Sequence, residues 1–243
     1  MNSNTLPILI LLGRPAAGKS EIIDYLKRTP LDVRIRRFHI GDFAEIDDFP
    51  LLWAWYEEDA LLNRMGHPRL HMTADGYFTR RYLWDLLIQR LSLEYDKWVR
   101  DAAAGNTAIL EFSRGSEHGG YRSALPNLSD IILQRAAILY IDVSWEESLR
   151  KNRRRFNPSK PDSILEHGLP DAKLERLYKE VDWREFSSPD GEYVVVRGQR
   201  VPYVVFDNED DVTTGRAPAL GDRLEDSLSR LWSLRGAGAN QND

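Results

Sequence analysis

The chain contains the octapeptide Gly13-Arg14-Pro15-Ala16-Ala17-Gly18-Lys19-Ser20, which matches the pattern G-x-x-x-x-G-K-[ST]. Its glycines allow the backbone to turn its N–H groups inward, where they can surround a phosphate group. Lys19 would place a positive charge beside the β- and γ-phosphates of a nucleotide, and the Ser20 hydroxyl would bind Mg²⁺. These residue types at this spacing predict a phosphate loop (P-loop, or Walker A motif) that binds ATP and Mg²⁺.

The neighbours of this octapeptide supply the context that a phosphate loop needs. An apolar run precedes it and a helix-like stretch follows it, so the N-terminus of a helix would face the phosphates. A glycine turn that caps a helix by chance is the alternative, and this context disfavours it. The residues predicted to bind ATP are Gly13, Ala16, Ala17, Gly18, Lys19, Ser20, Glu21 and Asn208, and those predicted to bind the metal are Ser20 and Glu111.

The composition of the chain is that of a globular intracellular protein. It has 243 residues, of which 42% are hydrophobic, enough for one large domain or two small ones. The formal net charge of −5 provides no general basic field for nucleic acid, and the absence of cysteine excludes disulfides and thiolate metal sites. The apolar run 6–12 is too short to cross a membrane. We therefore expect a cytoplasmic protein with neither a membrane nor a nucleic acid as its partner.

Apolar runs and helix-like patterns alternate along the chain, which favours a doubly wound α/β domain. The runs expected to form strands are 7–12, 33–40, 107–112, 137–143 and 203–206. The stretches expected to form helices are 19–28, 51–64, 80–104, 145–155, 174–185 and 221–234. Two apolar segments around Gly198 predict a hairpin. We expect the P-loop NTPase fold, with a mainly parallel five-stranded sheet flanked by helices.

Polar residues follow several of the expected strands, at the edge where open α/β sheets bind ligands. They are Asp42, Glu111, Arg114, Asp142, Asp207 and Asn208. Asp42 would orient or deprotonate a phosphoryl acceptor, unless it only caps the following helix. Glu111 would hold Mg²⁺ through water or act as a base, unless it only pairs with an arginine. Arg114 would clamp a phosphate, neutralise Glu111, or do both.

An arginine-rich segment at 150–155 follows the fourth expected strand. Helical spacing puts Arg150, Arg153 and Arg154 on one face. At least one of Arg150, Arg154 and Arg155 would neutralise charge on the transferred phosphoryl group, and a solvated basic face is the alternative. The residues predicted to be catalytic are Lys19, Asp42, Glu111, Arg114, Arg150 and Arg154.

Two other segments have both a structural and a functional interpretation. Trp53, Trp55 and Tyr56 would stack on a ring of the ligand or pack in the core, and packing is favoured because such side chains bury a large area. The glycine-rich segment 113–125, which contains His118, would shape the acceptor site or form a surface turn.

Four segments of the chain occur in an order typical of one enzyme family. They are the P-loop, "FHIGDF" at 38–43, "AILEFSRG" at 108–115, and the strand, turn and helix pattern at 140–155. Together they resemble the nucleoside and nucleotide kinases, the adenylate-kinase-like P-loop kinases. The resemblance spans 6–210. The chain departs from the family's pattern at Glu111, where an aspartate is more usual, and over 49–82, which matches no acceptor pocket of the family.

The resemblance implies transfer of the γ-phosphoryl group of ATP, with Mg²⁺, to a small molecule, in the first place a nucleoside or nucleotide. It also implies one kinase-like domain over 1–243, with an acceptor-binding insertion at 43–82 and a lid at 152–190. Residues 236–243 are expected to form a disordered tail. Two alternatives stay open: a kinase of another small hydroxyl compound, and a regulatory nucleotide-binding module with little turnover.

Overall fold

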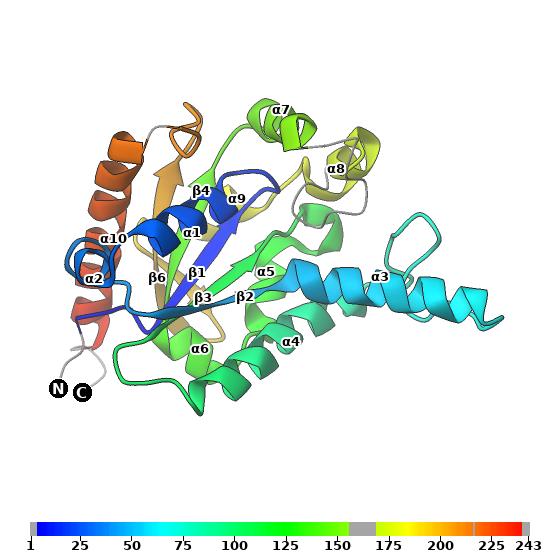
Figure 1. The fold of residues 1–243 in the computed structure, drawn as a ribbon, viewed down its shortest axis with the longest axis horizontal. Coiled ribbons are helices and arrows are strands. Elements are labelled where there is room, and N and C mark those ends of the chain that lie inside the picture. The colour runs from blue at the N-terminus through cyan, green and yellow to red at the C-terminus, as the bar shows by residue number, and fades with distance from the viewer. Residues whose placement is uncertain (1–3, 156–168, 216, 240–243) are drawn as a thin grey trace.

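The computed structural model of the protein describes residues 4–155, 169–215 and 217–239. A six-stranded sheet lies at its centre, in the order β2-β3-β1-β4-β6-β5 (Figure 1). Its strands are β1 (Ile8–Gly13), β2 (Phe43–Asp47), β3 (Thr107–Phe112), β4 (Ala136–Asp142), β5 (Tyr193–Val196) and β6 (Gln199–Asp207). All neighbouring strands run parallel except β5, which pairs antiparallel with β6. The mainly parallel sheet is confirmed, and the first arm of the expected hairpin adds a sixth strand to the five predicted.

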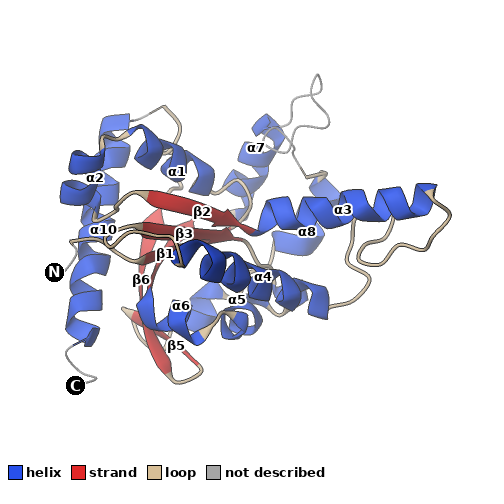
Figure 2. Cartoon of the chain, turned by 60° about the horizontal axis from the view of Figure 1, so that its bottom comes forward, coloured by secondary structure: helices blue, strands red, loops and turns tan. Residues whose placement is uncertain are grey.

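Helices cover both faces of the sheet (Figure 2). One face packs against α1 (Lys19–Arg28), α2 (Leu31–Phe38) and α10 (Ala217–Ala239), and the other against α4 (Tyr82–Val99), α5 (Gly120–Ala124), α6 (Asp130–Arg135) and α9 (Trp183–Ser187). Short helical turns at Ser116–His118 and Leu125–Asn127 flank α5. The helices α3 (Asp48–Arg64), α7 (Trp145–Arg155) and α8 (Asp171–Tyr178) lie beyond the carboxyl ends of the strands.

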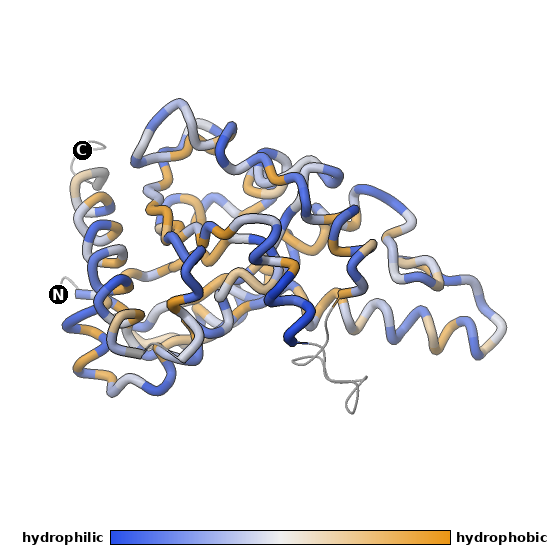
Figure 3. The backbone as a smooth tube through the Cα atoms, turned by 90° about the horizontal axis from the view of Figure 1, so that it is seen from above, coloured by the Kyte–Doolittle hydropathy of each residue, from blue (hydrophilic) through white to orange (hydrophobic). Residues whose placement is uncertain are grey.

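The alternation of side chains along β1 accounts for the two helical layers. Ile8 and Ile10 pack with α4, α5 and α6, whereas Leu9 and Leu11 pack with α1, α2 and α10. All four are fully buried, as expected of a central parallel strand. The C-terminal helix α10 has the complementary pattern, because its buried leucines recur every three or four residues, and hydrophobic and hydrophilic stretches alternate along it in Figure 3.

The expected strand over 33–40 is wrong, since this stretch forms most of α2. The buried positions of α2, Arg34 and Phe38, are four residues apart, which suits a helix and not a strand. The Arg34 guanidinium donates to two backbone carbonyl groups at 3.0 Å, so a charged side chain is satisfied inside the protein. The edge strand is β2 instead, which occupies the beginning of the segment 43–82 predicted as an insertion.

Several other boundaries differ from expectation. The expected helix at 174–185 is divided between α8 and α9, α3 begins at Asp48, and α4 ends at Val99. The tail expected to be disordered is helical as far as Ala239.

The predicted lid over 152–190 lies partly outside the described residues, and its described part contains the end of α7 together with α8 and α9. No helix within the described ranges has the combined length and hydropathy of a membrane span.

Candidate active site

The phosphate loop joins β1 to α1 and has the backbone conformation that its glycines permit. Gly13 has a φ of 153° and Gly18 a φ of 114°, and Ala16 also has a positive φ of 58°. A Cβ atom at Gly18 would lie 2.6 Å from the Asn208 side-chain nitrogen and 2.8 Å from the Thr213 hydroxyl, so no side chain fits there. The backbone can therefore fold closely around an anion at the N-terminus of α1.

Side chains hold the phosphate loop in place. Arg14 of the loop donates to two backbone carbonyl groups of other segments, at 2.8 and 3.1 Å. The Ser148 hydroxyl donates to the backbone of the loop at 2.8 Å, and Asn208 Nδ2 donates to the Ala17 carbonyl oxygen at 2.7 Å. Asn208 is fully buried behind the loop, so the structure gives it a positioning role in place of the expected contact with ATP.

Lys19 is the buried cation of the loop. Its Nζ donates to Ser113 Oγ at 2.8 Å and to the Arg14 carbonyl oxygen at 3.1 Å, and it lies 3.8 Å from Glu111 Oε1. Burial lowers the pKa of Lys19, against the opposing effect of Glu111. Burial likewise raises the pKa of Glu111, against the effect of Lys19. The structure thus brings two predicted catalytic residues together at the carboxyl ends of neighbouring strands.

Asp47 is an acid of the site that the sequence analysis missed. It ends β2 and lies opposite Glu111 in the register of β2 and β3. Its Oδ1 accepts a hydrogen bond at 3.0 Å from the N–H of Phe49, which caps α3. Burial, followed by the nearby charges of Asp48 and Glu111, raises the pKa of Asp47 to about 8. A short β-like run that ends on two aspartates, at 43–48, is the sequence signal that identifies it.

Asp42 lies at the other end of β2. It precedes the strand instead of following one, its side chain is 77% exposed, and it forms an ion pair with Arg34 at 3.8 Å. The misassigned strand over 33–40 had placed Asp42 at the carboxyl edge of the sheet. The predicted catalytic position of Asp42 is therefore wrong, and Asp47 occupies the position that was expected of it.

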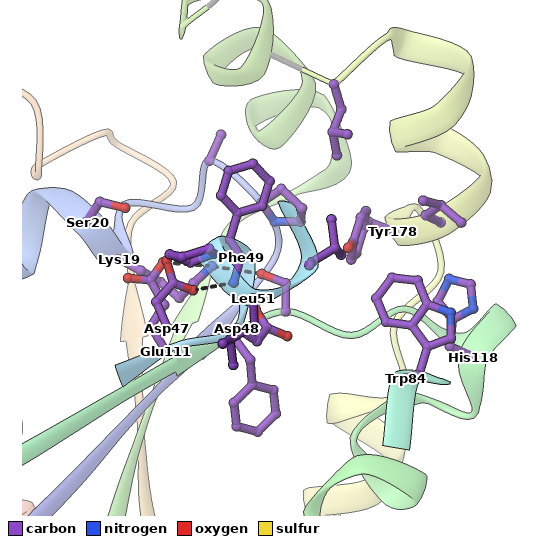
Figure 4. Close-up of a pocket in the computed structure, with 18 of the residues that line it drawn as sticks. Lys19, Ser20, Asp47, Asp48, Phe49, Leu51, Trp84, Glu111, His118 and Tyr178 are labelled. Carbon is purple, nitrogen blue, oxygen red and sulfur yellow. Dashed lines mark hydrogen bonds and ion pairs between the residues drawn. The ribbon is translucent and has the colours of Figure 1, made fainter. Parts of the chain in front are cut away.

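A cavity of about 1160 Å³ opens beside the phosphate loop. In Figure 4, Lys19, Asp47 and Glu111 lie together on one side of it, and Trp84 and His118 lie on the other. The last two rings stack with their centroids 4.1 Å apart. Other apolar and aromatic residues that line the cavity are Phe49, Leu51, Phe78, Trp98, Leu177 and Tyr178. The cavity therefore connects a charged side, beside the loop, to a largely aromatic side.

His118 places the glycine-rich segment 113–125 in the wall of this cavity. Burial lowers the pKa of His118 to about 4, so the imidazole is neutral at physiological pH. Its Nε2 has no hydrogen-bond partner in the part of the chain that the structure describes. Of the two interpretations of this segment, the structure favours the one in which it shapes the cavity.

Arg114 forms a buried ion pair with Asp48, with 2.6 Å between Nη1 and Oδ2. Its guanidinium also lies over the Trp84 ring, 5.0 Å from the centroid. Among the described residues, Arg114 is not one that lines the cavity. The expected pairing with Glu111 is not present, because Asp48 is the carboxylate within reach.

Besides Lys19 and Arg155, four described cationic side chains line the cavity: Arg80, Arg81, Lys173 and Arg176. Arg176 pairs with Glu117 at 3.0 Å, and Lys173 donates to two backbone carbonyl groups. Arg80 and Arg81 are exposed and form no ion pair with another described residue. These two arginines are therefore available to an anionic group of a ligand.

The arginines of α7 point to two different places. Arg150 and Arg154 lie 3.0 and 3.6 Å from Asp211, in the loop after β6, and neither belongs to the described cavity wall. Arg155 does line the cavity and forms an ion pair with Glu21 at 3.1 Å. The structure therefore favours Arg155 over Arg150 and Arg154 as the arginine beside the phosphate loop, and it gives Glu21 a cationic partner.

The aromatic residues of α3 pack against protein groups. The Trp55 and His71 rings stack with centroids 4.8 Å apart, and Trp53 contacts Tyr56 at 5.6 Å. None of the three predicted aromatic residues is among the described residues that line the cavity. All three side chains are only half-buried, so the expected packing in the core is met in part by Trp55, which packs against the cluster that contains Trp84.

The residues around the loop fit ATP and Mg²⁺. The Lys19 ammonium lies 3.8 Å from the Glu111 carboxylate, and the exposed Ser20 is the second residue of α1, whose N-terminus follows the loop. Ser20, Asp47 and Glu111 offer the oxygen ligands that Mg²⁺ prefers. No cluster of three acidic or histidine side chains suited to a metal is found among the described residues. A nucleotide-bound Mg²⁺ needs only one or two protein ligands beside phosphate and water, which this site supplies.

Comparisons with known proteins give weak likenesses only. No protein-family model and no curated protein sequence matches the chain. Among solved structures, a sugar kinase from Janibacter sp. HTCC2649 is 15% identical, with 94% of this chain and 97% of that chain covered and a TM-score of 0.42. TT1252 from Thermus thermophilus is 18% identical, with 93% of this chain and 97% of that chain covered and a TM-score of 0.43. Shikimate kinase from Acinetobacter baumannii, in complex with shikimate, is 16% identical, with 71% of this chain and 76% of that chain covered and a TM-score of 0.32. Likenesses this low assign neither a family nor a substrate.

Proposed function

We propose that this protein is a phosphotransferase that binds ATP with Mg²⁺ at the phosphate loop and phosphorylates a small molecule held in the adjoining cavity. The observation that carries this proposal is one cavity lined by Lys19, Asp47 and Glu111 and also by the stack of Trp84 and His118. A donor at the loop and an acceptor against the stack would meet beside the acids. Phosphoryl transfer depends mainly on such positioning and on electrostatic stabilisation.

The residues of the site suit separate roles in this reaction. Bound MgATP supplies the phosphoryl group together with a cation that neutralises its charge. The loop amides and Lys19 would bind the phosphates, and Ser20 and Glu111 would hold the metal. Asp47 would accept the proton of the attacking hydroxyl, because a base with a pKa near the working pH transfers protons efficiently.

We infer that the acceptor is a nucleoside or nucleotide. The aromatic side of the cavity supports this class, since a flat base can lie against the Trp84 and His118 pair or against Tyr178. Arg80 and Arg81 would bind an anionic group of the acceptor. Another small hydroxyl compound is the second candidate, because Asp47 and Glu111 would serve any hydroxyl brought beside them. A nucleotide-binding module with little turnover is the third.

An acceptor panel tests these candidates. ADP release from MgATP is measured with nucleosides, nucleotides, sugars and hydroxy acids, each against ATP alone, and products are identified by mass. We expect one chemical class to accelerate ADP release and to gain a phosphoryl group. Binding of MgATP without turnover of any acceptor would favour the regulatory module. Failure to bind MgATP in a calorimetric titration would overturn the proposal.

A further inference from the structure

Tyr121 lies where the sheet ends behind the phosphate loop. The pairing of β1 with β3 stops at Leu12, opposite Phe112, because β3 ends there. Gly13 continues β1 by one residue along β4, where it lies opposite Ile141. The first residue of the phosphate loop therefore has no backbone partner in β3.

The hydroxyl of Tyr121 takes the place of that partner. It accepts a hydrogen bond from the N–H of Gly13 and donates one to the carbonyl oxygen of Gly13, both at 3.1 Å. Burial raises the pKa of the Tyr121 phenol, so the hydroxyl keeps the proton that it donates. One oxygen atom thus bonds to both backbone polar groups of the residue that begins the phosphate loop.

The surroundings of Tyr121 hold this hydroxyl in a fixed position. Its side chain is fully buried, and its ring makes edge contacts with Tyr140 and Trp183, with centroids 6.0 and 5.7 Å apart. Its backbone N–H donates to Asp182 Oδ1 at 2.8 Å. Tyr121 also follows His118 by three residues, so the segment that forms part of the cavity wall also contacts the loop.

We propose that Tyr121 is a positioning residue of the phosphate loop, whose hydroxyl fixes Gly13 and through it the direction of the loop amides. This inference rests on the proposed function, because it assumes that MgATP binds at the loop. The binding energy of preorganised donors depends on their being aimed at the phosphate before it arrives. Loss of the hydroxyl would therefore weaken nucleotide binding without removing any group that touches the nucleotide.

The variant Tyr121→Phe removes this oxygen and keeps the ring. We expect the dissociation constant for MgATP, measured by isothermal titration calorimetry, to rise about tenfold, as loss of one or two hydrogen bonds that order the site implies. We also expect the amide of Gly13 to exchange faster with deuterium in the variant without nucleotide. Both effects should occur while the far-ultraviolet circular dichroism stays that of the wild type.

Tyr203→Phe is the matched control. Tyr203 is also buried, contacts Trp183 at 5.3 Å, and bonds through its hydroxyl to the backbone carbonyl groups of Ser187 and Asp190. Loss of the Tyr203 hydroxyl should lower the melting temperature about as much as loss of the Tyr121 hydroxyl does, and it should leave the affinity for MgATP unchanged.

Three outcomes would count against the inference. If Tyr121→Phe bound MgATP with wild-type affinity, the inference would be overturned and the proposed function would stand. If Tyr203→Phe lost as much affinity as Tyr121→Phe, the inference would also be overturned, because the loss would then reflect general stability. A wild-type protein that does not bind MgATP would overturn the inference together with the proposed function.

Discussion

Nη1 of Arg114 lies 2.6 Å from Oδ2 of Asp48, and both side chains are buried. This contact joins the segment after β3 to the first residue of α3. Arg114 also donates to the Trp84 carbonyl oxygen in α4 at 3.3 Å. One guanidinium therefore connects the sheet to two helices whose residues line the cavity.

Removal of one partner of this pair is expected to destabilise the protein strongly. In Asp48→Asn the buried guanidinium loses its countercharge, and we expect the free energy of unfolding to fall by about 3 kcal/mol. The free energy of unfolding of the variant and of the wild type is measured by denaturant titration, with circular dichroism as the signal. The double variant with Asp48→Leu and Arg114→Leu should recover part of the loss, since no buried charge remains. If the losses measured in Asp48→Leu and Arg114→Leu alone added up to the loss in the double variant, the pairing would be contradicted.

Lys19→Ala is expected to reduce turnover of ATP by at least about 100-fold, because the site loses its buried cation for the phosphates. The fold should survive, since burial of Lys19 does not serve a hydrophobic core. ADP release and circular dichroism are measured together. Lys27→Ala, which removes an exposed lysine of the same helix, is the control and should retain wild-type turnover. Near-normal turnover in Lys19→Ala would refute the kinase proposal.

Asp47→Asn is expected to lower turnover with the identified acceptor by about 100-fold or more, while the affinity for MgATP changes little. The reason is that an amide cannot accept the proton of the attacking hydroxyl. Asp42→Asn is the matched control at the other end of β2, and its turnover should equal that of the wild type. Equal losses in the two variants would show that neither acid acts as the base.

His118 is expected to make stability depend on pH. Its pKa is about 4 in the folded protein against an ordinary value of 6.5, so between these values the unfolded chain binds a proton that the folded chain does not. Stability should therefore fall as the pH drops from 7 to 5, by about 1–2 kcal/mol more in the wild type than in His118→Gln. Denaturant titrations at both pH values test this. His67→Gln, at an exposed position, is the control and should lose as much stability between pH 7 and pH 5 as the wild type. An equal loss in His118→Gln would show that His118 is not held neutral by burial.

The sequence by itself determined the phosphate loop and the central strands, because both depend on neighbouring residues. The glycines, Lys19 and the helix that follows are contiguous, and the loop geometry is set within that stretch. The run that became β1 is apolar up to its final glycine, and the run that became β3 is apolar from Ala108 to Leu110, which is typical of central strands buried on both faces. These features could be predicted without knowledge of any distant contact.

Only the tertiary structure decided which charged residues meet. The stretch 33–40 contains arginines and β-branched residues, and its helical state follows from burial of Arg34 against carbonyl groups of other segments, which no local pattern reveals. Asp47 reaches Glu111 only through the register of two strands that lie about 60 residues apart in the chain. Arg114 pairs with Asp48 and not with Glu111 for the same reason. The partner of a buried charge is determined by packing over long sequence separations, so Asp47, the acid that we propose as the base, could not be identified before the strands were placed.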